Sequence, residues 1–288
     1  MPADKYCKAF ADNIEDALAK KNLRLPGKCV SPMTHGYRPE MDCTAELKWE
    51  GIQQYQEIIG SLRWAVELGR VDILLETALL SKHLALPREG HLEQAFHMVG
   101  YLKSHRKMKL LFDSDEPRVN EKWFSSYDWY DFYRHVKKTI PPNMPEARGN
   151  AIVTTCFVDA NHAGDKKDRR SQTGVPFFIN KAPIHWYSKK QSTVEASTFG
   201  AEFCAMRTAI KMAEGLRYKL RMFGVPIDGA TNIYCDNEAV YKNTIVPEST
   251  LKKKHHSIAY HRCREAVAAE TVRVTKQGKT KNLADFFN

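Results

Sequence analysis

The sequence lacks the cysteine spacing of a disulfide scaffold or a zinc ribbon. Its seven cysteines are odd in number, widely scattered and never arranged as C-x-x-C. They are Cys7, Cys29, Cys43, Cys156, Cys204, Cys235 and Cys263. Because disulfide frameworks form in oxidising compartments, this cysteine usage favours a reducing one.

Long hydrophobic runs are also missing. The most apolar stretch, residues 58–80, is interrupted by five charged residues: Arg63, Glu67, Arg70, Asp72 and Glu76. A bilayer span needs about 20 predominantly apolar residues, so we expect no transmembrane helix. The first residues lead into a charged segment without the apolar core of a secretory signal. We therefore expect a cytoplasmic or nuclear protein that is not secreted.

The composition is that of a globular protein with a basic surplus. Of the 288 residues, 43% are hydrophobic and 27% are charged. At about 100–200 residues per domain, this length predicts about two domains. Lysine and arginine number 44 against 34 acidic residues, and the resulting formal charge of +10 favours a polyanionic partner.

The first half of the chain has mainly helical periodicity. Apolar residues recur at helical spacing between residues 53 and 111. We expect breaks in this pattern at Gly60, Gly69, Pro87 and Gly90. Residues 113–150 are rich in aromatic side chains and end in a proline-rich segment, residues 140–150, which we interpret as a linker. The predicted organisation is a mainly helical domain over residues 1–139, this linker, and a second domain over residues 151–288.

The second domain alternates strands and helices. Short β-branched and aromatic runs at residues 152–158, 175–179 and 184–187 predict an antiparallel meander. A long helix entered through a capping box at residues 192–195 should follow and end near Gly224. Strands at residues 232–235 and 271–275 and helices near residues 237–243, 256–269 and 283 complete the pattern. The predicted fold class is α/β, with a mixed sheet flanked by helices.

Four acidic residues fall where these elements could present them together. Asp159 and Asp236 end predicted strands, Glu202 lies in the long helix, and Asp285 opens the last helix. Such a cluster suits two Mg²⁺ ions in phosphodiester hydrolysis, because hard oxygen ligands bind Mg²⁺ and relieve the repulsion between carboxylates. Taken singly, each acid has another reading, as a turn former, a helix cap or a solvated surface residue.

At these residues the sequence resembles the ribonuclease H domain of copia-type (Ty1/copia) retrotransposon polyproteins. The resemblance spans residues 154–287 and is carried by ordered segments at residues 157–165, 169–174, 186–191, 197–203, 235–237, 254–255, 260–261 and 283–285. It implies a ribonuclease H-like fold and a catalytic, metal-binding set of Asp159, Glu202, Asp236 and Asp285. Glu195 is the rival for the helical acid, but the family motif has the acid directly before an aromatic residue, as in Glu202-Phe203.

The first domain also looks copia-like. Segments at residues 59–64, 70–73, 80–81 and 101–103 resemble the thumb and connection that follow a polymerase palm. No Tyr-x-Asp-Asp motif and no adjacent Asp-Asp pair occur in the sequence, so DNA synthesis by this chain alone is not expected.

Basic residues near the predicted site suggest contacts with phosphates. The nucleic-acid-binding candidates are Arg169, Arg170, Lys189, Lys190, Gln191, Lys252, Lys253, Lys254 and His255. A solvated surface is the alternative reading of these charges. His162, His255, His256 and His261 could suggest a metal site, but Mg²⁺ prefers oxygen and no cysteine is close to them in sequence, so we interpret them as structural or phosphate-facing.

The resemblance implies a Mg²⁺-dependent endonuclease that hydrolyses the RNA strand of RNA/DNA hybrids. It would use two ions, with Mn²⁺ as a substitute, and act with the polymerase part of a parent polyprotein in the cytoplasm, within a virus-like particle, or in the nucleus. The alternative is an inactive retrotransposon relic that keeps the fold and binds nucleic acid without catalysis.

Overall fold

The computed structural model describes residues 3–251 and 254–288, and only the backbone of Lys279. The chain forms two compact units, residues 1–110 and 111–288. Among the described residues, no helix has the length and hydropathy needed to cross a membrane.

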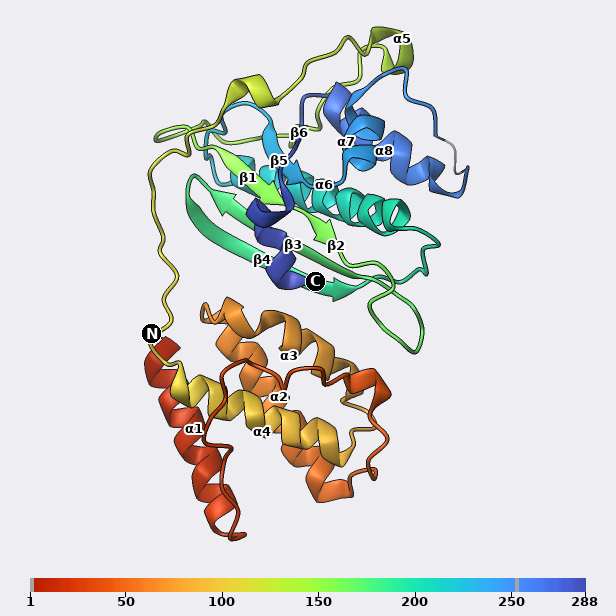
Figure 1. Ribbon diagram of the computed structural model, residues 1–288. Helices are drawn as coiled ribbons and strands as arrows, with labels where there is room; N and C mark the ends of the chain where they lie inside the picture. The colour runs from red at the N-terminus through yellow and green to blue at the C-terminus, as the bar shows by residue number, and fades with distance from the viewer. Residues whose placement is uncertain (1–2, 252–253) are drawn as a thin grey trace. The chain divides into compact units, whose positions relative to one another are not determined.

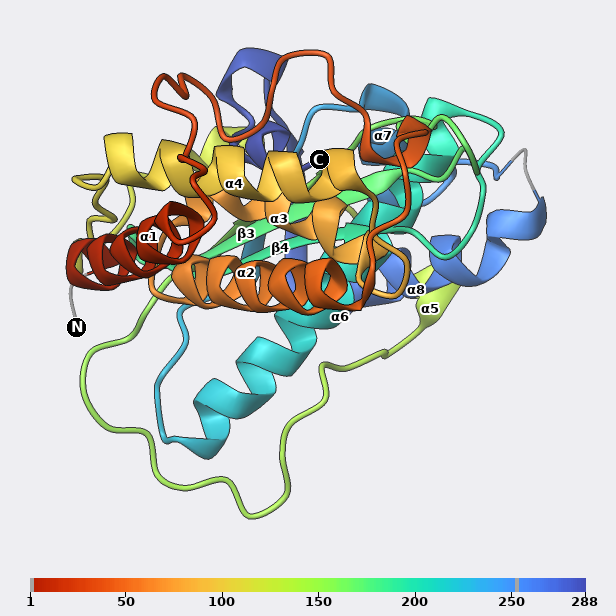
Figure 2. The ribbon, with the colours of Figure 1, turned by 90° about the horizontal axis from the view of Figure 1, so that it is seen from below.

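The first unit is helical, as the periodicity predicts. Its elements are α1 (Ala3–Ala19), η1 (Pro39–Met41), α2 (Trp49–Glu67), η2 (Val71–Ile73), α3 (Leu74–Leu80), η3 (Ser81–His83) and α4 (Glu89–Ser104). Helix α4 packs against both α1 and α2, and the three lie side by side in Figures 1 and 2. Their core includes the fully buried residues Tyr55, Ile58, Leu62 and Met98.

Three details of this unit differ from the sequence prediction. Helix α1 was not predicted, although Cys7, Phe10, Ile14 and Leu18 are buried along one of its faces. Helix α2 runs through Gly60, where burial of the neighbouring Ile58, Ile59 and Leu62 outweighs the roughly 1 kcal/mol that glycine costs in a helix. Gly90 likewise lies inside α4, where a larger residue would meet the Asp42 carboxylate.

The second unit contains one mixed sheet, which confirms the predicted fold class. Its strands are β1 (Thr154–Phe157), β2 (Asp159–Ala160), β3 (Gln172–Ile179), β4 (Ala182–Lys190), β5 (Thr231–Cys235) and β6 (Val272–Lys276). Strands β1 and β2 both pair antiparallel with β3, which also pairs antiparallel with β4. On the other side of β1, strands β5 and β6 are parallel to it.

Helices cover the sheet and complete its core. They are α6 (Thr198–Met222), α7 (Glu238–Ile245), η5 (Lys254–His256), α8 (Ser257–Ala268), η6 (Lys279–Lys281) and η7 (Leu283–Phe287). Helix α6 packs on β2, β3 and α8, with Phe203, Met206 and Ile210 in the core. The predicted capping box is wrong: α6 begins at Thr198, and the Ser197 hydroxyl accepts a hydrogen bond from the Gly200 amide at 3.2 Å.

The short helix η7 lies on the face of the sheet opposite α6 (Figure 1). Successive residues of a strand point to opposite faces. Thr173 of β3 faces α6, because its hydroxyl accepts from Gln191, whose side chain also donates to the Ala201 carbonyl. The next residue, Gly174, faces η7, since a Cβ there would lie 2.6 Å from the Ala284 carbonyl oxygen.

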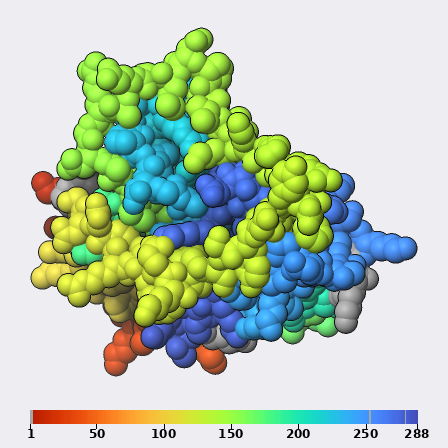
Figure 3. Space-filling model, turned by 90° about the horizontal axis from the view of Figure 1, so that it is seen from above, coloured from red at the N-terminus to blue at the C-terminus, as the bar shows by residue number. Residues whose placement is uncertain are grey.

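Residues 111–139 pack with the second unit, whereas the sequence analysis placed them with the helical domain. The segment contains η4 (Glu121–Trp123) and α5 (Tyr130–Tyr133) and lies across the surface of this unit, yellow to green in Figure 3. Glu121 pairs with Arg273, and the Trp123 carbonyl accepts from Thr275 at 2.7 Å. Residues 140–150, all of them described, form no helix or strand.

Arg264 joins this segment to the helices. Its side chain is 2% exposed, and its guanidinium donates to four acceptors: the carbonyls of Asn243, Val246 and Pro247 and the Ser249 hydroxyl. The rings of Trp129 and Tyr260 lie 4.8 and 4.5 Å from the guanidinium carbon. Aromatic faces stabilise a buried cation, so the segment supplies one side of the arginine's binding pocket.

Replacing Arg264 by methionine should therefore destabilise the second unit by about 3 kcal/mol, because buried acceptors lose their charged donor. The matched control is Arg262→Met on the same helix, whose pairing with Glu214 is about half exposed on the arginine side and should contribute less than about 1 kcal/mol. Denaturant unfolding followed by tryptophan fluorescence measures both. Equal losses in the two variants would contradict the role assigned to Arg264.

Candidate functional site

The sheet brings the two strand-end acids to one edge. Asp159 opens β2 and is separated from the end of β1 by Val158 alone, and Asp236 follows β5 directly. Strands β1 and β5 are parallel neighbours, so their carboxyl ends lie side by side. Helix α6 presents Glu202 to this edge from one face, and η7 presents Asp285 from the other.

All four predicted acids meet there. Carboxylate oxygens of Asp159, Asp236 and Asp285 lie within 4.8 Å of one another. Glu202 shares a hydrogen bond with the Asp159 side chain and accepts another from the Ala160 backbone. Asp159 and Glu202 are buried, Asp236 is partly buried and Asp285 is exposed, so the cluster is open to solvent on the Asp285 side.

The cluster carries uncompensated negative charge. Burial, followed by the charge of Asp159, its hydrogen bond and the charge of Asp236, raises the pKa of Glu202 to about 10. Glu202 is therefore protonated at neutral pH when no cation is present. A divalent cation among these oxygens would lower the pKa of Glu202 and favour its deprotonated carboxylate. The donor set, all hard oxygens, fits Mg²⁺.

Two asparagines that the sequence analysis did not single out hold η7 at the site. The Asn282 side chain donates to the Val158 carbonyl at 3.1 Å and accepts from the Ala284 amide at 3.2 Å. Asn288 donates to Asp159 Oδ2 at 2.6 Å. The signal for Asn282 was its place as a helix cap before Leu283-Ala284-Asp285.

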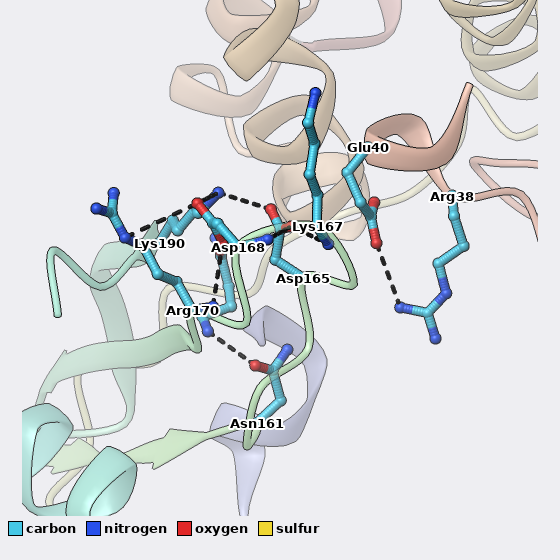
Figure 4. A network of polar contacts seen from close by, with 9 residues as sticks. Arg38, Glu40, Asn161, Asp165, Lys167, Asp168, Arg170 and Lys190 are labelled. Carbon is cyan, nitrogen blue, oxygen red and sulfur yellow. Dashed lines mark hydrogen bonds and ion pairs between the residues drawn. The ribbon is translucent and has the colours of Figure 1, made fainter. Parts of the chain in front are cut away.

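The basic candidates on the hairpin differ in what they contact. Arg169, Arg170 and Lys189 are exposed. Lys190 is partly buried between two carboxylates, with its Nζ 2.6 Å from Asp165 Oδ2 and 2.5 Å from Asp168 Oδ2 (Figure 4). The same Asp168 oxygen lies 3.8 Å from Arg170 Nε.

The remaining candidates precede or follow α6 in the sequence. Gln191 donates to the Thr173 hydroxyl and the Ala201 carbonyl, so its amide ties β3 to the start of α6. Lys252 and Lys253 lie outside the described residues, while Lys254 and His255 are exposed in η5. Glu195, the rival for the helical acid, is buried away from the four-acid set, where its carboxylate faces His255 and His256.

These features define a mixed α/β unit with a carboxylate cluster suited to divalent cations. The chain is similar to retrovirus-related Pol polyproteins of Ty1/copia-like transposons along 92 to 94% of its length, as the motif resemblance predicted. It is 25% identical over 272 residues to the retrovirus-related Pol polyprotein from transposon RE1 of Arabidopsis thaliana. It is 26% identical over 234 residues, 80% of the chain, to that from transposon TNT 1-94 of Nicotiana tabacum.

The chain covers only 16% and 15% of the lengths of these two relatives. No protein-family model matches the sequence. Among solved structures, the chain is similar to LC11-RNase H1, crystallised in complex with an RNA/DNA hybrid, with a TM-score of 0.38 and 14% identity. That similarity covers 46% of this chain and 92% of the solved one.

Gly174→Ala tests how Asp285 is positioned. A Cβ at this position would lie 2.6 Å from the Ala284 carbonyl oxygen and 2.9 Å from Phe287 Cβ, so η7 must move. We expect Mg²⁺ affinity, measured by isothermal titration calorimetry, to fall by about 10-fold or more, as when partners that orient a metal ligand are lost. Gly278→Ala is the control, because nothing lies within 4 Å of its Cβ. Unchanged affinity in Gly174→Ala would show that η7 does not place a ligand.

Proposed function

We propose that the second unit is a Mg²⁺-dependent endonuclease that hydrolyses the RNA strand of RNA/DNA hybrids. The observation that carries this proposal is the convergence of Asp159, Glu202, Asp236 and Asp285, which are remote in sequence, on one edge of the sheet. Homology to Pol polyproteins supports a role in retroelement replication.

The four acids have distinct positions in this proposal. Asp159, Glu202 and Asp236 would hold the metal ions, and the exposed Asp285 would complete the second ion's site. Bound ions would supply activation of the attacking water and stabilisation of the leaving oxygen in an in-line displacement, which would give 3′-hydroxyl and 5′-phosphate ends. The buried Asp159 and Glu202 are fixed by the Asn288 and Ala160 hydrogen bonds, so they form the rigid side of the site. Mn²⁺ would substitute for Mg²⁺.

The substrate would be recognised by shape and charge. Arg169, Arg170, Lys189, Lys254 and His255 are exposed and would contact phosphates, while discrimination of RNA from DNA would use the 2′-hydroxyl. The first unit would correspond to the thumb and connection of a reverse transcriptase, with the polymerase part of a longer polyprotein as partner. The site of action would be a cytoplasmic virus-like particle or the nucleus.

The assembled acids favour this nuclease over the inactive relic. A relic is released from the need to keep these acids together, and in the absence of a cation their repulsion is relieved only by protonation of Glu202. Here all four are retained and clustered.

Asp159→Asn should abolish hybrid cleavage, by about 1,000-fold or more, because removal of one charged ligand from the metal set weakens transition-state stabilisation. Binding of the hybrid in the absence of Mg²⁺ should change little, since phosphate contacts provide most of the affinity. Hybrid cleavage is measured on a labelled RNA/DNA duplex with and without EDTA. Hybrid binding is measured by fluorescence anisotropy. The control is Asp228→Asn, an exposed carboxylate outside the cluster. A fully active Asp159→Asn variant would refute the assignment.

Lys189 and Lys190 should affect hybrid binding differently. Lys189→Ala removes an exposed charge and should lower the slope of log K against log salt by about one. Lys190→Ala should leave that slope less affected but cost about 1 kcal/mol or more in stability, because Asp165 and Asp168 lose their shared cation. Salt titrations and denaturant unfolding of both variants provide the comparison. An equal change in slope would show that Lys190 also contacts phosphate.

A further inference from the structure

A second cluster of metal-ligand side chains lies outside the four-acid site. Glu195 belongs to the loop before α6, and His255 and His256 belong to η5. One ligand atom from each lies within 4.8 Å of the other two. We propose that Glu195, His255 and His256 bind one divalent transition-metal ion of the zinc class, which fixes η5 to the start of α6.

The separations suit a tetrahedral ion. The Nε2 atoms of His256 and His255 lie 3.2 and 3.9 Å from the same carboxylate oxygen, Glu195 Oε2. Ligand bonds of about 2.0–2.1 Å at tetrahedral angles place two ligand atoms about 3.3 Å apart. Binding therefore requires only small shifts, and the exposed His255 is free to make them because 62% of its side chain is accessible.

Neighbouring donors orient the Glu195 carboxylate. Its Oε1 accepts hydrogen bonds from the Thr193 hydroxyl at 3.0 Å and the Cys204 thiol at 3.3 Å. The other oxygen, Oε2, is thereby turned toward the two imidazoles. Outer partners of this kind fix ligand geometry in metal sites. No cysteine is close to these histidines in sequence, but the fold brings Cys204 to the same carboxylate.

Space is kept beside the ligand atoms by Gly200. A Cβ at this position would lie 2.6 Å from Glu195 Oε2 and 2.9 Å from His256 Nε2. On the inner side, the rings of Phe199 and Phe203 pack edge-on against His256, which is 4% exposed. The site is thus walled by apolar groups on one side and open to solvent at His255.

The donor set selects the class of ion. Two imidazoles and one carboxylate suit Zn²⁺, Co²⁺ or Ni²⁺, whereas Mg²⁺ prefers oxygen ligands. The site is separate from the four-acid cluster, because Gly200 and Cys204 lie on one face of α6 and Glu202, between them, lies on another. The proposal does not depend on nuclease activity, but it gives His255 a ligand role in place of the phosphate contact proposed above.

Equilibrium dialysis of the full chain against micromolar Zn²⁺, with bound metal counted by mass spectrometry, tests the proposal. Cys43, an exposed thiol, is first replaced by serine to remove a competing zinc ligand. We expect one bound Zn²⁺ that millimolar Mg²⁺ does not displace. His255→Ala should weaken this binding by more than about 10-fold, since loss of even an outer partner costs that much.

The matched control is His261→Ala, which removes an exposed histidine of α8 outside the cluster and should retain the ion. His255 is exposed, so its replacement leaves the fold intact, and thermal unfolding without metal verifies this. In the presence of Zn²⁺ the parent should unfold at a higher temperature and His255→Ala should not. Absence of stoichiometric Zn²⁺ in the parent, or equal binding in His255→Ala and the parent, would overturn the proposal.

Discussion

Repulsion among four carboxylates is the constraint around which the second unit is organised. Two of the acids follow the parallel strands β1 and β5, whose carboxyl ends lie at the same edge of the sheet. Parallel strands need a crossover connection, which here runs through α6 between β4 and β5. The same crossover helix contributes Glu202, and the chain returns through η7 to contribute Asp285. Burial makes the clustered negative charge unfavourable and raises the pKa of Glu202. The same cluster would therefore attract a cation strongly.

The order of elements and the acids were predictable because each depends on local pattern. Strand periodicity and turn residues located β1, β3, β4, β5 and β6 to within a few residues. The acids followed from their places at strand ends and from motif order. What periodicity could not supply was the partner of each charged group: Lys190 carries the same formal charge as Lys189, and only the loop that folds Asp165 and Asp168 onto it distinguishes the two.

The errors have a common physical origin in long-range packing. Residues 192–195 match the capping-box pattern, but Glu195 contacts His256, 61 positions later, and does not cap the helix. Ser197 caps α6 instead. The proline-rich segment suggested a boundary at residues 140–150, yet the aromatic residues before it cover Arg264 and β6. Helix α1 was overlooked because its mean hydropathy is low, although its apolar face is regular.

The wrapping of residues 111–139 around the second unit bears on how the chain tolerates proteolysis. Residues 140–150 lie outside any helix or strand, and such segments are preferred sites of cleavage. A cut there would leave two fragments held together by the ion pair between Glu121 and Arg273 and by the cation–π contact between Trp129 and Arg264. A nicked molecule would therefore migrate as one particle under native conditions and as two pieces only after denaturation. A fragment begun at residue 151 would leave the guanidinium of Arg264 without its Trp129 cover.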